Sequence, residues 1–173
     1  MHRKLNKPTF AQKLIRRINV ALDRVCGYDF LTVIPVNELG LDERLVSKCS
    51  PSWSKLLANV FAELHITNAD RILDVGCGKG AVMRGLIKFP FLRVDGIEIS
   101  DKLAEIARDN FNKLKSSVKI FNVNAIDFIG YGDYNFIYFY NPFPAVIMEL
   151  VMNNLSVQMS DVRCQMSGDN NYL

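Results

Sequence analysis

The chain has 173 residues, of which 49% are hydrophobic and 23% charged, as expected for one globular domain with a substantial core. Its net charge of +3 conceals an asymmetry, because residues 1–24 carry seven Lys or Arg and one acid. No apolar run approaches the ~18 residues of a membrane-spanning helix. Four widely spaced cysteines without a Cys-x-x-Cys pair predict free thiols in a reducing, cytoplasmic compartment and no metal site.

Residues 8–25 are predicted to form a basic amphipathic helix. Two interpretations stay open: electrostatic contact with nucleic acid or an acidic membrane surface, and a capping helix with a solvated basic face. A short extended segment, Phe30–Val36, follows, and the N-terminal part is taken as residues 1–48. The apolar positions of the helix are Phe10, Leu14, Ile18, Ala21, Leu22 and Val25.

A second domain, residues 49–155, begins with a helix predicted to start at Ser50-Pro51. Trp53 is interpreted as a core residue of this part. The helix leads into a strand that includes Arg71–Val75 and is followed at once by a glycine-rich turn and another helical pattern. A strand, a glycine turn and a helix in this order let the backbone approach a ligand closely.

The turn reads Asp-x-Gly-x-Gly-x-Gly and resembles the first motif of class I S-adenosylmethionine-dependent methyltransferases. The resemblance implies a Rossmann-like α/β fold, a mainly parallel sheet flanked by helices, and methyl transfer from S-adenosylmethionine. It also implies that the cofactor lies where any Cβ would collide with it, and that the aspartate orients the loop and the cofactor's amino group. The cofactor-binding residues so implied are Asp74, Gly76, Cys77, Gly78 and Gly80.

One rival interpretation is a dinucleotide site of an NAD(P)-dependent oxidoreductase. Gly76, Gly78 and Ala81 also fit the G-x-G-x-x-G/A pattern of such sites. Asp74, which precedes the first glycine, favours the methyltransferase. A catalytically silent S-adenosylmethionine-binding fragment is a further alternative.

Two later strands carry further candidates. Glu98 ends the second predicted strand, residues 93–99, and the resemblance assigns its carboxylate to the ribose hydroxyls. Asn124 and Ala125 follow the third predicted strand, residues 118–123, at the position where the family contacts the adenine edge. The Asn124 amide offers an acceptor to the adenine amine. Asp127 is the alternative for this role, and a cap of the following turn is the other interpretation of Asp127.

The fourth predicted strand, residues 134–140, ends in Asn141-Pro142-Phe143-Pro144. This tetrapeptide resembles the Asn-Pro-Pro-aromatic motif of methyltransferases that act on planar amines, although Phe143 and Pro144 depart from it. We assign Asn141 to the acceptor side as the candidate catalytic residue; a plain turn is the alternative. The methyl acceptor could be protein, nucleic acid or a small molecule.

The last part of the chain is predicted to be a helix from Ala145 to Leu155 and a disordered tail over residues 156–173. Four strands are predicted, whereas the family's sheet has seven, so the chain is interpreted as C-terminally truncated. Phe136–Tyr140 would then form an edge of the sheet.

Overall fold

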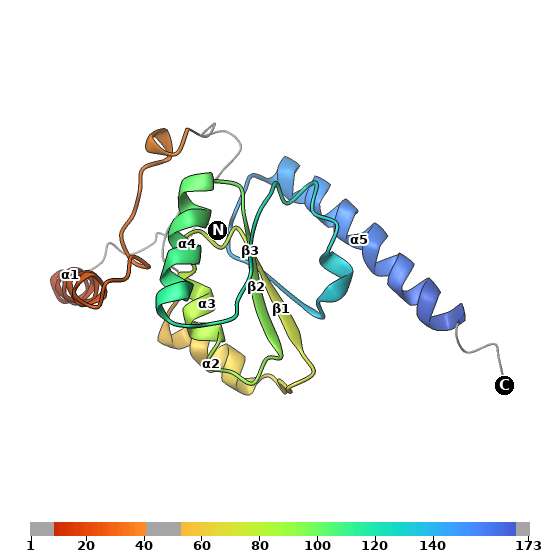
Figure 1. Cartoon of the computed structure of the whole chain (residues 1–173), viewed down its shortest axis with the longest axis horizontal. Coiled ribbons are helices and arrows are strands. Elements are labelled where there is room, and N and C mark those ends of the chain that lie inside the picture. Colours follow the sequence, from red (N-terminus) through yellow and green to blue (C-terminus); the bar gives the residue numbers. More distant parts are fainter. Residues whose placement is uncertain (1–8, 41–52, 169–173) are drawn as a thin grey trace.

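The computed structural model describes residues 9–40 and 53–168 (Figure 1). Four strands in these residues form one sheet, with the order β3-β2-β1-β4. All strand pairs are parallel, so the predicted α/β fold is confirmed. In the described residues β4 lies at one edge, as predicted. The strands are β1 (Arg71–Val75), β2 (Arg93–Glu98), β3 (Ile120–Asn122) and β4 (Phe136–Phe139).

Helices cover both faces of the sheet (Figure 1). One face packs against α2, α3 and α4, and the other against α5 and the 3-10 helix η2. Alternate residues of β1 serve the two cores: Ile72 lies in the first, and Leu73 and Val75 in the second. The helices are α1 (Phe10–Val25), η1 (Val36–Glu38), α2 (Lys55–Glu63), α3 (Ala81–Leu86), α4 (Asp101–Lys113), η2 (Tyr131–Asp133) and α5 (Ala145–Gly168).

Helix α2 begins later than predicted. Ser54 is its N-cap and accepts a hydrogen bond from the Leu57 N–H at 3.1 Å, whereas Ser50 and Pro51 lie outside the described residues. Trp53 packs into the core, as predicted. Its ring lies so close to Gly85 of α3 that a Cβ on that glycine would be only 2.2 Å from it.

The helix α5 corrects the predicted disordered tail, since it continues through residues 156–168. Two polar residues of α5, Asn154 and Gln158, bond to backbone that has no partner in the sheet. Asn154 donates to the carbonyls of Ile126 and Phe128, and Gln158 donates to Phe128 at 2.7 Å and accepts from the Tyr131 N–H. These two polar side chains thus hold α5 against the loop before β4.

Gly80 lies where the glycine loop enters α3, and its φ of 85° is left-handed. A Cβ there would lie 2.5 Å from Cε2 of Phe111, a buried residue of α4. We expect Gly80→Ala to lower the free energy of unfolding by about 2–4 kcal/mol through overpacking and backbone strain. Denaturant titration measures this. Gly27→Ala, with φ 79° and open space around its Cβ, is the control, and an equal loss there would contradict the overpacking explanation.

In the described part of the chain, every helix is too short or too polar to cross a bilayer.

Candidate functional site

The predicted site residues lie at the carboxyl ends of the four parallel strands, and these ends share one edge of the sheet. In an open parallel sheet, loops at this edge form the ligand crevice. The glycine loop follows β1, and each other strand contributes the residues at or just after its end. The residues so placed are Asp74, Gly76, Cys77, Gly78, Gly80, Glu98, Asn124, Ala125 and Asn141.

Asp74 is the fourth residue of β1 and is only 3% exposed. Its Oδ2 atom is buried and, among the described residues, is the one such side-chain atom without a hydrogen-bond partner. Burial, and then the charge of Glu98, raises the pKa of Asp74 from 3.8 to about 7. A buried polar atom without a partner is costly, so this carboxyl group is suited to a ligand that supplies a donor or a positive charge.

Glu98 ends β2 and links it to the glycine loop. Its Oε2 atom accepts from the Gly78 N–H at 2.9 Å, and its Oε1 atom accepts from the Ser100 N–H at 2.9 Å. Burial raises the pKa of Glu98, although these N–H groups act in the opposite direction. Each carboxylate oxygen keeps further acceptor capacity for a hydroxyl group.

The two acids share one face of the sheet. Asp74 pairs in register with Gly96, and Glu98 follows two residues later on the same strand, so both side chains project toward the α3 side. The loop's own cation does not neutralise them, because the Lys79 ammonium binds Asp29 at 2.6 Å. This edge of the sheet is therefore acidic at the ends of β1 and β2.

Two glycines of the loop lie tightly against side chains from other elements. A Cβ on Gly76 would lie 2.6 Å from Cβ of Pro142, and one on Gly80 would meet Phe111. These two glycines therefore make room for the protein's own side chains. Gly78, at φ 56°, remains the candidate for close ligand approach.

The loop's N–H groups are largely occupied within the protein. Those of Gly76 and Cys77 bond to the Ile97 carbonyl, that of Gly78 bonds to Glu98, and that of Gly80 bonds to the Cys77 carbonyl. A pyrophosphate cradle needs such groups to be free, so this loop is poorly suited to a dinucleotide. The Cys77 side chain packs in the core.

Asn124 and Ala125 form the turn after β3. The Asn124 Oδ1 atom accepts from the Ile126 N–H at 3.1 Å, and the buried Ala125 accepts from the Tyr131 hydroxyl at 2.8 Å. The sequence did not single out Asn122, whose side-chain amide donates to the carbonyls of Glu98 and Ile99 and fixes the end of β2.

Asn141 adopts a left-handed backbone, with φ 47°, directly after β4 and is exposed. Asparagine tolerates this conformation better than most residues, and such residues often occur at functional sites. The next residue, Pro142, packs beside Gly76. The structure thus brings Asn141 to the same edge as the glycine loop.

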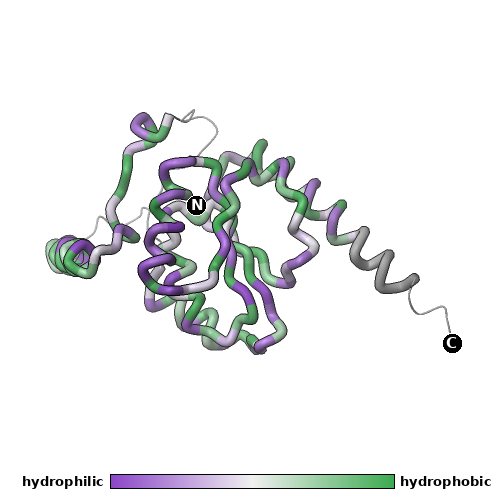
Figure 2. Tube along the Cα trace, viewed as in Figure 1, coloured by the Kyte–Doolittle hydropathy of each residue, from purple (hydrophilic) through white to green (hydrophobic). Residues whose placement is uncertain are grey.

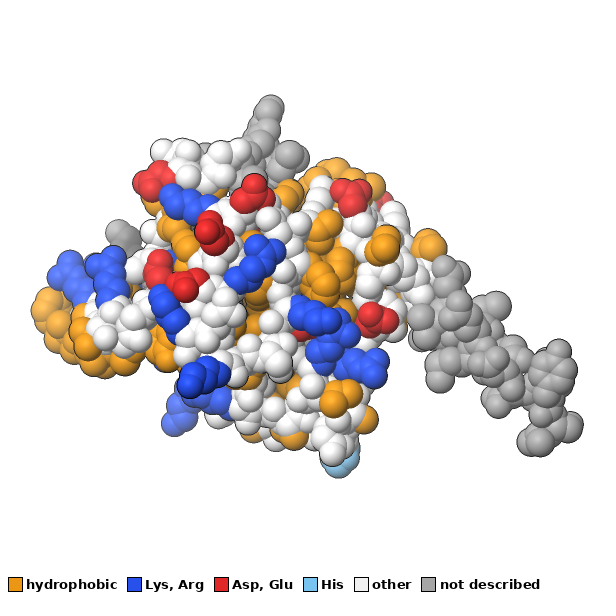
Figure 3. Space-filling model, in the orientation of Figure 1, with side chains coloured by type: hydrophobic (Ala, Val, Ile, Leu, Met, Phe, Trp, Pro, Cys, Tyr) orange, Lys and Arg blue, Asp and Glu red, His pale blue; other side chains and the backbone are white. Residues whose placement is uncertain are grey.

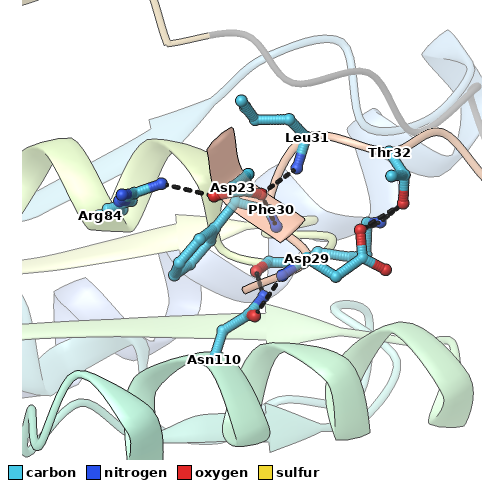
Figure 4. Close-up of polar contacts among 8 residues, drawn as sticks. Asp23, Asp29, Phe30, Leu31, Thr32, Arg84 and Asn110 are labelled. Atoms are coloured by element: carbon cyan, nitrogen blue, oxygen red, sulfur yellow. Dashed lines mark hydrogen bonds and ion pairs between the residues drawn. The ribbon is translucent and has the colours of Figure 1, made fainter. Parts of the chain in front are cut away.

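A buried network missed from the sequence ties the loop to an N-terminal strap, Tyr28–Thr32 (Figure 4). Lys79 binds Asp29 and Thr32, and the Asp29 N–H donates to Asn110 of α4 at 2.8 Å. Asn110 in turn donates to the Lys79 carbonyl at 3.2 Å, which closes a ring of contacts. A lysine inside a tight glycine loop was the available signal, because a buried ammonium requires a partner.

Asp23, the last-turn acid of α1, anchors the other side of the strap (Figure 4). Its carboxylate accepts from the N–H groups of Phe30 and Leu31 and from Arg84 of α3 at 2.8 Å. The segment predicted as extended therefore forms a loop against α3 and α4, and η1 follows Pro35. Among the described residues, no cluster of His, Cys, Asp and Glu could hold a metal ion.

Residues 72–157 match the family model described as "Methyltransferase domain". The chain is also 27% identical over 84 residues to a protein of Geobacillus sp. (strain WCH70) named "Putative methyltransferase". This match covers 49% of the chain and 34% of the relative, so the chain spans about a third of that relative's length.

Two solved structures share the fold. The HI0767 protein of Haemophilus influenzae, described as a "putative methylase", gives a TM-score of 0.53 at 18% identity, over 61% of this chain and 64% of that one. The PH0226 protein of Pyrococcus horikoshii OT3 gives a TM-score of 0.50 at 20% identity, over 58% of this chain and 45% of that one. Residues 72–157, which include the glycine loop and both acids, therefore form a methyltransferase domain with the class I, Rossmann-like fold.

Proposed function

We propose that the chain binds S-adenosylmethionine and transfers its methyl group to an acceptor that is protein, nucleic acid or a small molecule. The observation that carries the proposal is the buried, unpartnered Oδ2 atom of Asp74 beside a second buried acid, Glu98. S-adenosylmethionine supplies a methyl group activated on a sulfonium and also carries an ammonium. A positively charged ligand fits this crevice, because it would offset the cost of two buried carboxylates.

The same charges disfavour the NAD(P) alternative. A pyrophosphate would bring negative charge toward Asp74 and Glu98, and Lys79, the cation of the loop, is already bound to Asp29. The N–H groups that would hold a pyrophosphate are mostly engaged within the loop and with β2. Both features support a methyltransferase site over an oxidoreductase site.

The residues take distinct roles in this proposal. Asp74 holds the cofactor's amino group, Glu98 binds the ribose hydroxyls, and the Gly78 backbone lies under the cofactor. Asn124 and Ala125 border the adenine, and Asn141 holds the acceptor. Methyl transfer depends chiefly on positioning, so the site needs no separate acid–base pair.

Isothermal titration of the purified chain with S-adenosylmethionine, S-adenosylhomocysteine and NADH tests the cofactor. We expect saturable binding of the first two and none of NADH. NADH binding without S-adenosylhomocysteine binding would overturn the proposal. Incubation with methyl-labelled S-adenosylmethionine and pools of protein, RNA, DNA or small amines then identifies the acceptor class.

Glu98→Gln should weaken cofactor binding by about 1–3 kcal/mol, because a neutral amide accepts weaker hydrogen bonds than a carboxylate. Titration of adenosine ligands and their 2′-deoxy analogues isolates the ribose contact. Wild type should prefer the ribose form, and the variant should lose most of that preference. Glu105→Gln changes an exposed acid of α4 and is the control. Equal preference in wild type and Glu98→Gln would remove Glu98 from the ribose.

A further inference from the structure

Helix α1 has an apolar face that is exposed. Six large apolar side chains along it are between 48% and 85% exposed. At about 100° per residue they occupy an arc of roughly 140° around the helix axis. Figure 2 shows hydrophobic residues at the outer margin of α1, and Figure 3 shows them gathered beside Lys and Arg. These residues are Phe10, Leu14, Ile15, Ile18, Leu22 and Val25.

The opposite side of α1 holds the helix to the domain. Val20 is half-buried and Asp23 is buried, and on the helical wheel their midpoint lies about 180° from the middle of the apolar arc. Asp23 fixes this side through Arg84 and the strap backbone. The apolar face therefore points away from the domain, and burying it within the described fold would require breaking these contacts.

The exposed charge of α1 is wholly positive. Lys13, Arg17 and Arg24 lie along one flank of the apolar arc, and all three are exposed. The helix has one acid, Asp23, which is buried and paired with Arg84 at 2.8 Å. An apolar stripe beside exposed Lys and Arg is complementary to a surface that is apolar inside and anionic outside.

We infer that α1 docks the protein on an anionic lipid surface. The helix lies in the interface plane, with Phe10, Leu14 and Ile18 among the acyl chains and the basic flank at the headgroups. A second copy of the chain fits less well, because pairing two apolar faces would leave the basic flanks without an anionic partner. Nucleic acid would engage the basic flank and leave the apolar face exposed.

Co-sedimentation of the full chain with vesicles tests this inference. We expect binding to vesicles of equal parts phosphatidylserine and phosphatidylcholine, and much weaker binding to pure phosphatidylcholine. Leu14→Ser combined with Ile18→Ser should reduce binding at least about tenfold, because two apolar side chains no longer enter the lipid. Arg17→Gln combined with Arg24→Gln should reduce it about fivefold per charge removed, and added salt should weaken wild-type binding.

Ile129→Ser is the matched control, since Ile129 is 91% exposed but lies outside α1, and it should bind like wild type. Phe10→Trp adds a direct readout, because its fluorescence should shift to the blue on the anionic vesicles. All substituted side chains are exposed, and circular dichroism verifies that each variant folds. Light scattering and a single-stranded RNA titration test the rival partners.

Three results would overturn the inference. The first is equal binding to both vesicle types. The second is failure to bind vesicles together with a dimer that Leu14→Ser and Ile18→Ser dissociate. The third is RNA binding that needs Arg17 and Arg24 but not Leu14 and Ile18, without vesicle binding.

Discussion

Asp74→Asn should make the ligand-free protein more stable at pH 8 and leave its stability almost unchanged at pH 4. The pKa of Asp74 is raised from 3.8 to about 7 in the folded chain, so between these values the folded state binds more protons than the unfolded state. Stability is then lost as the pH rises through this window, by up to about 4 kcal/mol at 1.36 kcal/mol per pH unit. Asparagine cannot ionise and avoids that loss.

Urea titration of wild type and Asp74→Asn at several pH values between 4 and 8 measures the difference. Glu105→Gln, which removes an exposed acid on α4, is the control. Its difference from wild type in the free energy of unfolding should be the same at every pH. The same Asp74→Asn substitution should weaken S-adenosylhomocysteine binding at least about tenfold, because the ligand's ammonium loses a charged partner. A variant that gains no stability at pH 8 would show that Asp74 is not held in a costly, buried state.

Gly78→Val should abolish cofactor binding in titration calorimetry at concentrations that saturate wild type. Gly78 has φ 56°, and its N–H bonds to Glu98 in the crevice. A branched Cβ would both enter the space proposed for the ligand and disfavour this backbone conformation. Two effects on one residue of the loop explain why the expected loss is complete.

Gly27→Val separates these two effects. Gly27 has φ 79°, and a Cβ there would meet nothing within 4 Å, so valine introduces backbone strain without blocking a site. We expect this control to lower the melting temperature but to keep cofactor affinity. Unchanged affinity in Gly78→Val would contradict the assignment of the glycine loop to the cofactor.

The sheet and the glycine loop could be predicted because their signals are local. Arg71–Gly80 contains a strand, an acid and alternating glycines, and a helix begins at the next residue. These patterns follow from backbone geometry and do not depend on distant contacts.

Long-range polar pairs could not be predicted in this way. Lys79 and Asp29 are separated by 50 residues, and each resembles an ordinary solvated charge when its neighbours alone are considered. Gln158 resembles a tail residue, yet it bonds to the loop before β4. The space beside Gly76 is likewise set by Pro142, which follows a different strand. Such partners are decided by the tertiary fold.

The 50-residue separation between Lys79 and Asp29 also bears on the order in which the protein assembles. Closing so long a loop costs chain entropy before its contacts are made, so contacts of this kind generally form late. We expect β1 and β2, whose paired residues are 22 positions apart, to pair first, and the glycine loop to reach its final shape only when the strap docks. In pulse-labelled hydrogen exchange, the Gly78 N–H should then become protected after the N–H groups of β1 and together with that of Asp29.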